Sequence, residues 1–158
     1  MTHTRTKLAA LLAIVITLTD QISKWWVLNL FSAAPEPTKP IVPFFNLVLV
    51  HNRGVTFGLL NSVNHAWVTY GLIAVACAIV FLLGRWLIMT TSTRVAIALG
   101  AIIGGALGNV IDRLYFGSVV DFLDFYYGAY HWPAFNIADS AIVCGVALLL
   151  LDSMVRAK

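Results

Sequence analysis

Four apolar segments dominate this chain, and each is long enough to cross a lipid bilayer as an α-helix. They are expected at about residues 8–30, 66–84, 95–114 and 136–155. A bilayer core of about 30 Å needs about 20 helical residues. Only 11% of the 158 residues are charged, whereas about 25% is usual in a soluble domain. The sequence therefore predicts a single integral membrane domain over residues 1–158, mostly α-helical.

The start of the chain also resembles a cleavable signal peptide. Arg5 and Lys7 precede the first apolar segment, and Ser32-Ala33-Ala34 offers small residues for cleavage. The apolar run nevertheless continues past Asp20 and Lys24, which makes it too long for the apolar region of a signal peptide. We therefore favour an uncleaved transmembrane helix.

Lysine and arginine gather on one side of the predicted membrane topology. That side holds Arg5, Lys7, Arg85, Arg94, Arg156 and Lys158, whereas the other side holds Lys39 and Arg53, apart from Arg113 at a helix end. Short loops rich in these residues stay in the cytoplasm. Both termini are therefore expected to be cytoplasmic, and the opposite loops are expected to face outward.

The longest polar interval, at about residues 35–62, is expected to be a β-rich extracytoplasmic loop. Prolines stop a helix early in this interval. Residues 41–50 are rich in β-branched and aromatic side chains, which favour strands. A small β-sheet lying on the membrane surface is the predicted result, because aromatic rings collect at the membrane interface.

Glycines recur every four residues in the third apolar segment. Gly100, Gly104 and Gly108 form one row, and Ala101 and Gly105 form a second. Small residues at this spacing let transmembrane helices pack closely. Such packing would bring Asn109 and Asp112, which share a helix face, against a neighbouring helix.

Four of the six aspartates lie in the second half of the chain near one membrane face: Asp112, Asp121, Asp124 and Asp139. Carboxylates at a membrane edge are costly and usually functional. Asn136 and Asp139 start the fourth helix, where they fit a capping pair. Alternatively, Asp139 is an active carboxylate whose partner lies just upstream in the chain. Spacing does not choose between Asp121 and Asp124 as the partner of Asp139. Asp112 is a third candidate, although Arg113 beside it suggests charge balance.

Asp20 and Lys24 are four residues apart in the first helix, in the favoured order for an ion pair. They fit either an internal ion pair or a polar face that supports the outer site. Lys24 is also the only lysine in a predicted membrane helix, so a serine/lysine peptidase would have to use it. No serine is obviously placed for that chemistry.

The outer sequence Asn52-Arg53-Gly54 fits a simple turn, although Arg53 is also free to meet a lipid phosphate or a peptide carbonyl. The two cysteines, Cys77 and Cys144, have no metal-ligand spacing around them. We expect no metal and no other cofactor. A helical scaffold or ion transporter is the non-enzymatic alternative, but a transporter should place its ionisable residues near the midplane and often shows internal repeats.

Five blocks of this sequence resemble the bacterial lipoprotein signal peptidase (signal peptidase II) family. They are Asp20-Gln21-Ile22-Ser23-Lys24, Asn52-Arg53-Gly54-x-x-Phe57, Gly104-Gly105-Ala106-x-Gly108-Asn109-x-x-Asp112-Arg113, Val119-Val120-Asp121-Phe122 and Phe135-Asn136-x-Ala138-Asp139. They occur in the family's order over residues 20–139. One departure is Val55-Thr56, where small residues such as alanine are usual.

The resemblance implies a membrane aspartyl endopeptidase that removes the signal peptide of lipid-modified prolipoproteins, cutting before the lipidated cysteine. It assigns the catalytic pair to Asp121 and Asp139. It assigns site-shaping or other characteristic positions to Asn52, Gly54, Asn109, Asp112, Arg113, Asn136, Asp20 and Lys24. The implied partners are prolipoprotein substrates, membrane lipids and globomycin-type inhibitors in a bacterial cytoplasmic (inner) membrane, with no nucleic acid.

Two such carboxylates would share one proton, because they cannot both ionise cheaply. The charged one would activate a water, and the protonated one would donate to the scissile carbonyl oxygen. The expected chemistry is therefore metal-free peptide hydrolysis.

Overall fold

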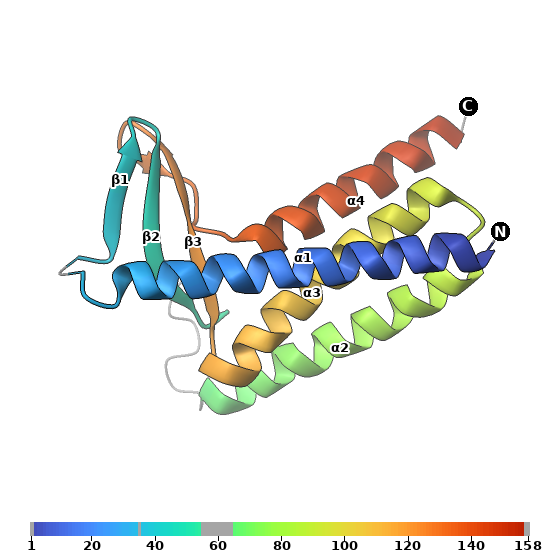
Figure 1. The fold of residues 1–158 in the computed structure, drawn as a ribbon, viewed down its shortest axis with the longest axis horizontal. Helices are drawn as coiled ribbons and strands as arrows, with labels where there is room; N and C mark the ends of the chain where they lie inside the picture. Colours follow the sequence, from blue (N-terminus) through green and yellow to red (C-terminus); the bar gives the residue numbers. More distant parts are fainter. Residues whose placement is uncertain (1, 35, 55–64, 157–158) are drawn as a thin grey trace.

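The structure, a computed structural model, describes residues 2–34, 36–54 and 65–156. Its four helices are α1 (Thr2–Phe31), α2 (His65–Met89), α3 (Thr93–Phe116) and α4 (Ile137–Arg156). All four are long and apolar enough to span a membrane. With a four-stranded antiparallel sheet at one end of the helices (Figure 1), they confirm the predicted fold class. Part of the predicted outer loop and Val55-Thr56 lie outside the described residues.

The helices extend a few residues beyond the predicted apolar segments. The expected end of the second segment at residue 84 depended on Arg85, yet α2 continues to Met89. A charged residue ends an apolar run but not a helix, since its long side chain can reach the interface. α3 has clear ends: Ser92 caps its first turn by accepting a hydrogen bond from Val95 N, and Gly117 ends it with a φ of 70°.

α3 is the central helix, and its glycines allow the other helices to approach (Figure 1). A Cβ added at Gly100 would lie 2.6 Å from the carbonyl oxygen of Ala9 on α1, and one at Gly104 would lie 2.7 Å from that of Ala13. A Cβ at Gly105 would collide with the carbonyl oxygen of Ala138 on α4. The two glycine rows therefore contact two different helices, which confirms the predicted close packing.

The sheet contains β1 (Thr38–Val42), β2 (Phe45–Asn52), β3 (Val119–Tyr127) and β4 (Tyr130–His131), in that spatial order. β2 and β3 pair antiparallel, with Val50 opposite Asp121 and Asn46 opposite Asp124. The sequence predicted strands only in the first half of this set. β3 was missed because its partner strand is distant in the chain, although its run of β-branched and aromatic residues is typical of a strand.

The sheet packs against the C-terminal end of α1. At 30 residues, α1 is about 45 Å long, which exceeds the thickness of a bilayer core. Val27 and Phe31 in its last turns form a buried cluster with Leu47 of β2 and Phe122 of β3. α1 begins and α4 ends at the opposite end of the bundle from the sheet (Figure 1).

Candidate active site

Asp121 and Asp139 are brought together by two elements, the strand β3 and the first turn of α4. Asn136 connects them. Its side-chain Nδ2 donates to Asp121 Oδ1 at 2.7 Å, and its backbone N–H donates to Asp139 Oδ2 at 3.3 Å. Asn136 is completely buried. One residue therefore contacts both carboxyl groups.

Asn136 also caps α4. Its Oδ1 accepts from the Asp139 backbone N–H at 2.8 Å, while the Asp139 carboxylate accepts from the Asn136 backbone N–H. This reciprocal arrangement satisfies two helix-end donors. The capping interpretation of this pair is correct, but it describes only part of what Asn136 does.

Two further asparagines complete the hydrogen bonding of the pair. Asn52 Nδ2 donates to Asp121 Oδ2 at 2.9 Å, and Asn109 Nδ2 donates to Asp139 Oδ1 at 2.8 Å. Each of the four carboxyl oxygens thus accepts a hydrogen bond. These donors fix the orientation of both carboxyl groups, because the residues that supply them lie in three places: β2, α3 and the position before α4.

The turn after β2 orients Asn52. Gly54 has a φ of 75°, in the region that favours glycine, and its N–H donates to Asn52 Oδ1 at 2.8 Å. This contact leaves Asn52 Nδ2 directed at Asp121. The turn interpretation of Asn52-Arg53-Gly54 is therefore correct, and the turn also serves the site.

The pKa of the Asp121 carboxyl is raised to about 6. Burial is the largest cause, and the charge of Asp139 also raises the pKa. The hydrogen bonds from Asn52 and Asn136 and the charge of Lys24 act in the opposite direction. Asp121 is 1% exposed, whereas Asp139 is half-buried. The two carboxyl groups thus occupy different environments, as an acid and a base require.

Asp124 lies apart from this pair. It is three residues from Asp121 on one strand, and residues an odd number apart point to opposite faces. Its carboxylate accepts from Asn46 Nδ2 at 2.8 Å and contacts His131 Nδ1 at 2.9 Å. The geometry therefore places Asp121, and not Asp124, beside Asp139.

Lys24 forms a buried ionic cluster behind the carboxyl pair. Its Nζ lies 2.7 Å from Asp20 Oδ2, 2.8 Å from Asp112 Oδ2 and 3.1 Å from Asn109 Oδ1. These acceptors match the three donors of an ammonium group. The predicted Asp20–Lys24 ion pair is present, and it is joined to the site through Asn109. Lys24 is consequently unsuited to act as a base for a serine.

Asp112 forms a direct ion pair with Lys24, and it also interacts through its charge with Arg113, the neighbour that was expected to balance it. Adjacent residues of a helix point in different directions, so Asp112 faces α1 while Arg113 does not. Gln21, which was not singled out as a site residue, donates to Asp112 Oδ1 at 2.9 Å. Its place beside Asp20 on the polar part of α1 was the available signal.

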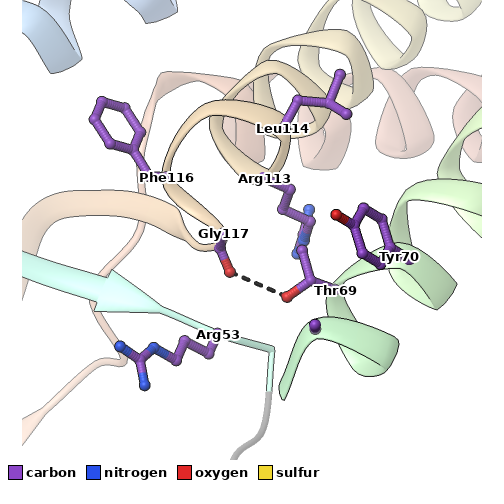
Figure 2. Close-up of a pocket in the computed structure, with 8 residues that line it drawn as sticks. Arg53, Thr69, Tyr70, Arg113, Leu114, Phe116 and Gly117 are labelled. Carbon is purple, nitrogen blue, oxygen red and sulfur yellow. Dashed lines mark hydrogen bonds between the residues drawn. The ribbon is translucent and has the colours of Figure 1, made fainter. Parts of the chain in front are cut away.

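A pocket of about 440 Å³ lies next to the site, where α2 begins and where α3 and β2 end. Figure 2 shows Arg113 directed from the last turn of α3 toward Tyr70 and Thr69 of α2, with Arg53 on the other side of the pocket. Thr69 donates to the carbonyl of Gly117 at 3.1 Å, which holds the two helix ends together. Arg113 is half-buried and contacts Asn109 O at 3.4 Å. Its guanidinium has five N–H donors, so it can bind a carbonyl group in the pocket.

Among the described residues, no group of three or more His, Cys, Asp or Glu side chains is placed to hold a metal ion. The arrangement between β3 and the start of α4 consists of two carboxyl groups, three asparagines and a neighbouring arginine. Chemically, such a set can activate a water and polarise a carbonyl.

Comparisons with known proteins point to one family. A family model described as signal peptidase (SPase) II matches residues 12–155. The lipoprotein signal peptidase of Paraburkholderia phymatum is 47% identical over 149 residues, covering 92% of this chain and 87% of that protein. The lipoprotein signal peptidase of Burkholderia thailandensis is 42% identical over 148 residues, covering 93% of this chain and 87% of that protein.

Two solved structures, both described as bacterial membrane enzymes, have the same fold. One has a TM-score of 0.80 at 26% identity and covers 96% of this chain and 90% of its own. The other has a TM-score of 0.78 at 27% identity and covers 92% of each chain. The similarity therefore extends over the helices and the sheet together.

Proposed function

Because this chain belongs to the signal peptidase II family, we propose that it is an aspartyl endopeptidase that removes the signal peptide from diacylglyceryl-modified bacterial prolipoproteins. It cuts before the lipidated cysteine. The observation that carries the aspartyl mechanism is the position of Asn136, which donates to Asp121 and Asp139 at 2.7 and 3.3 Å. A single buried amide residue thus keeps two carboxyl groups in one site.

In this mechanism Asp121 holds the proton and Asp139 is the base. Burial favours the neutral form of Asp121, whose pKa is raised to about 6. Asp139 lies in the first turn of α4, where the helix dipole favours a negative charge. The two groups therefore start the reaction in complementary protonation states.

The reaction requires one water between the two carboxyl groups. Asp139 takes a proton from this water as its oxygen attacks the scissile carbonyl carbon, while Asp121 donates its proton to the carbonyl oxygen. The tetrahedral intermediate then collapses with cleavage of the C–N bond. The leaving amine receives the proton held by Asp139, and a hydroxyl of the intermediate returns its proton to Asp121, which leaves a carboxylic acid that ionises. The products are a signal peptide with a free carboxylate and a lipoprotein whose cysteine carries a free amine.

The location of the site suits a lipid-modified substrate. The sheet lies at the bundle end opposite the termini (Figure 1), and Asp121 belongs to its strand β3. The positive-inside rule assigns the termini to the cytoplasm. The site then faces outward from a bacterial inner membrane, where a signal-peptide helix ends and the acyl chains enter the lipid. Arg113 is placed to bind a substrate carbonyl. Membrane lipids and globomycin-type inhibitors are the other proposed partners.

The two alternative functions have less support. An ion transporter would use ionisable groups near the midplane, but Asp20 and Lys24 are linked through Asn109 to the outer carboxyl pair. A serine/lysine peptidase would need a neutral Lys24, whose Nζ already contacts Asp20, Asp112 and Asn109.

The proposed substrate class can be tested with the purified full chain in detergent. We expect cleavage of a diacylglyceryl-modified prolipoprotein and a new N-terminus at the lipidated cysteine by mass spectrometry. The same prolipoprotein without the diacylglyceryl group should remain uncut. Equal cleavage of both would contradict the substrate class, and cleavage of neither would contradict the peptidase function.

A further inference from the structure

Lys24 is 2% exposed, although it hydrogen-bonds to neither Asp121 nor Asp139 in the structure. A buried ammonium group is costly unless it is fully paired. Lys24 satisfies this requirement by joining Asp20 of its own helix to Asp112 of α3, at 2.7 and 2.8 Å. The two paired aspartates also make contacts of their own with the main chain.

Each of these aspartates holds the backbone immediately before one member of the carboxyl pair. Asp112 Oδ2 accepts from the N–H of Val120, the residue before Asp121, at 2.9 Å. Asp20 Oδ1 accepts from the N–H of Ala138, the residue before Asp139, also at 2.9 Å. The two contacts are equivalent, one made to the strand β3 and the other to the first turn of α4.

We propose that Asp20, Lys24 and Asp112 form a positioning unit that sets the separation of Asp121 and Asp139. Lys24 fixes the distance between its two aspartates, and each aspartate fixes the main chain beside one carboxyl group. This inference rests on the proposed aspartyl peptidase function. None of the three side chains touches the substrate or donates a proton in the reaction, so they act through the residues that they hold.

The surroundings of the unit leave it little freedom. Gln21 Nε2 donates to Asp112 Oδ1 at 2.9 Å and to the carbonyl of Gly108 at 3.2 Å. A Cβ at Gly108 would lie 2.6 Å from Asp20 Oδ2. Glycine at this position therefore leaves the space that the Asp20 carboxylate occupies. Such restraint matters because a misplacement of about 1 Å can lower a rate about 100-fold.

Gly108 and Gly104 offer a matched pair of variants. Both lie on the face of α3 that contacts α1, one turn apart. A methyl group at Gly108 would displace the Asp20 carboxylate, whereas a methyl group at Gly104 would press on the backbone of Ala13, which has no part in the unit. If helix packing alone mattered, Gly104→Ala should be at least as harmful, because a backbone yields less than a side chain.

The test measures kcat and KM for diacylglyceryl-prolipoprotein cleavage by the full chain in detergent, together with thermal unfolding. Gly108→Ala is expected to lower kcat about 100-fold with KM changed by less than about threefold. Gly104→Ala should retain kcat within about threefold of wild type in its folded fraction. Equal loss of kcat in the two variants, or a loss that follows the unfolding temperature, would overturn the proposal.

A second comparison separates positioning from proton chemistry. Asp20→Asn and Asp20→Ala both lose the charge that pairs with Lys24, but Asp20→Asn keeps an oxygen that can accept from the Ala138 N–H. The Asn variant is expected to keep at least tenfold more of the wild-type kcat than the Ala variant. Equal kcat values in the two variants would overturn the proposal.

Asp139→Asn distinguishes a failure of the proposed peptidase function from a failure of the positioning unit. If wild type cuts and Asp139→Asn does not, the proposed function stands whatever the Gly108 and Asp20 variants do. If wild type itself does not cut this substrate, the proposed function fails and the positioning unit fails with it.

Discussion

The side-chain amide of Asn136 donates a hydrogen bond to Asp121 Oδ1 at 2.7 Å, which ties the start of α4 to the strand β3. The same residue caps α4 and donates its backbone N–H to Asp139. One asparagine therefore serves both the stability of a membrane helix and the arrangement of the carboxyl pair. These two roles can be separated by substitution.

Asn136→Ser is expected to keep the helix cap and lose the bridge to Asp121, because serine caps well but is too short to reach the strand. Asn136→Ala should lose both. We expect Asn136→Ala to lower the free energy of unfolding by about 1–2 kcal/mol relative to Asn136→Ser, while both variants lose most of their kcat. Thermal unfolding and cleavage assays in detergent measure the two effects. Wild-type kcat in Asn136→Ser would contradict the bridging role.

The pH dependence of cleavage should report the shared proton of the pair. Since the pKa of Asp121 is raised to about 6 and its protonated form is the acid, kcat/KM should fall as the pH rises through about 6. The apparent pKa values belong to the pair and not to one residue. A profile that keeps rising up to pH 8 would contradict the assignment of Asp121 as the acid.

Asn52→Ala should move that alkaline limb to higher pH. The Asn52 hydrogen bond at 2.9 Å favours the ionised form of Asp121 and lowers its pKa against the effect of burial. Its loss therefore raises the pKa, and the protonated acid persists to higher pH. The pH profile of kcat/KM is the measurement, and a shift to lower pH would show that the contact has the opposite effect.

The local features of this fold could be predicted from the sequence. The four apolar runs predicted the membrane helices, and the glycine spacing predicted the close contacts of α3, because both patterns depend only on neighbouring residues. β3 could not be placed in the same way. It pairs with β2, but α2 and α3 lie between the two strands in the sequence. Hydrophobicity within β3 therefore does not identify its partner.

The same difference between local patterns and long-range contacts applies to the site. Spacing alone leaves Asp121 and Asp124 equivalent. The family resemblance favours Asp121, and the positions of the two residues on opposite faces of β3 give the physical reason. Asp112 was expected to be balanced by Arg113, but its partner Lys24 lies on another helix. A contact across helices depends on how the helices pack, which no short sequence window contains.

Helix packing can be tested at two glycines with different surroundings. An added Cβ at Gly105 would collide with the carbonyl oxygen of Ala138, whereas Gly71 has nothing within 4 Å of an added Cβ. Gly105→Ala should lower the free energy of unfolding by about 1–3 kcal/mol. Gly71→Ala should leave stability unchanged or increase it by up to about 1 kcal/mol. Equal unfolding temperatures for the two variants would contradict the packing of α3 against α4.

Arg113→Gln should weaken substrate binding because it removes a charged donor from the pocket beside the site. A charge-assisted hydrogen bond contributes about 1.5–3 kcal/mol, so KM is expected to rise about tenfold or more. Tyr115→Phe is a suitable control, since Tyr115 is 81% exposed and lies outside the residues that line the pocket. An unchanged KM in Arg113→Gln would exclude a role in substrate binding.

The central claim is that Asp121 and Asp139 carry out the hydrolysis. Its most direct test is cleavage of a diacylglyceryl-modified prolipoprotein by wild type, Asp121→Asn, Asp139→Asn and Asp124→Asn, purified in detergent with a chelator present. Asparagine keeps the shape of each side chain and removes its proton chemistry.

We predict that the Asp121 and Asp139 variants lose at least about 1,000-fold in kcat, within the combined range of general acid–base catalysis. Asp124→Asn should remain active because Asp124 contacts His131 and Asn46 on the other face of β3. Activity in either Asp121→Asn or Asp139→Asn, or loss of activity in Asp124→Asn alone, would contradict the account.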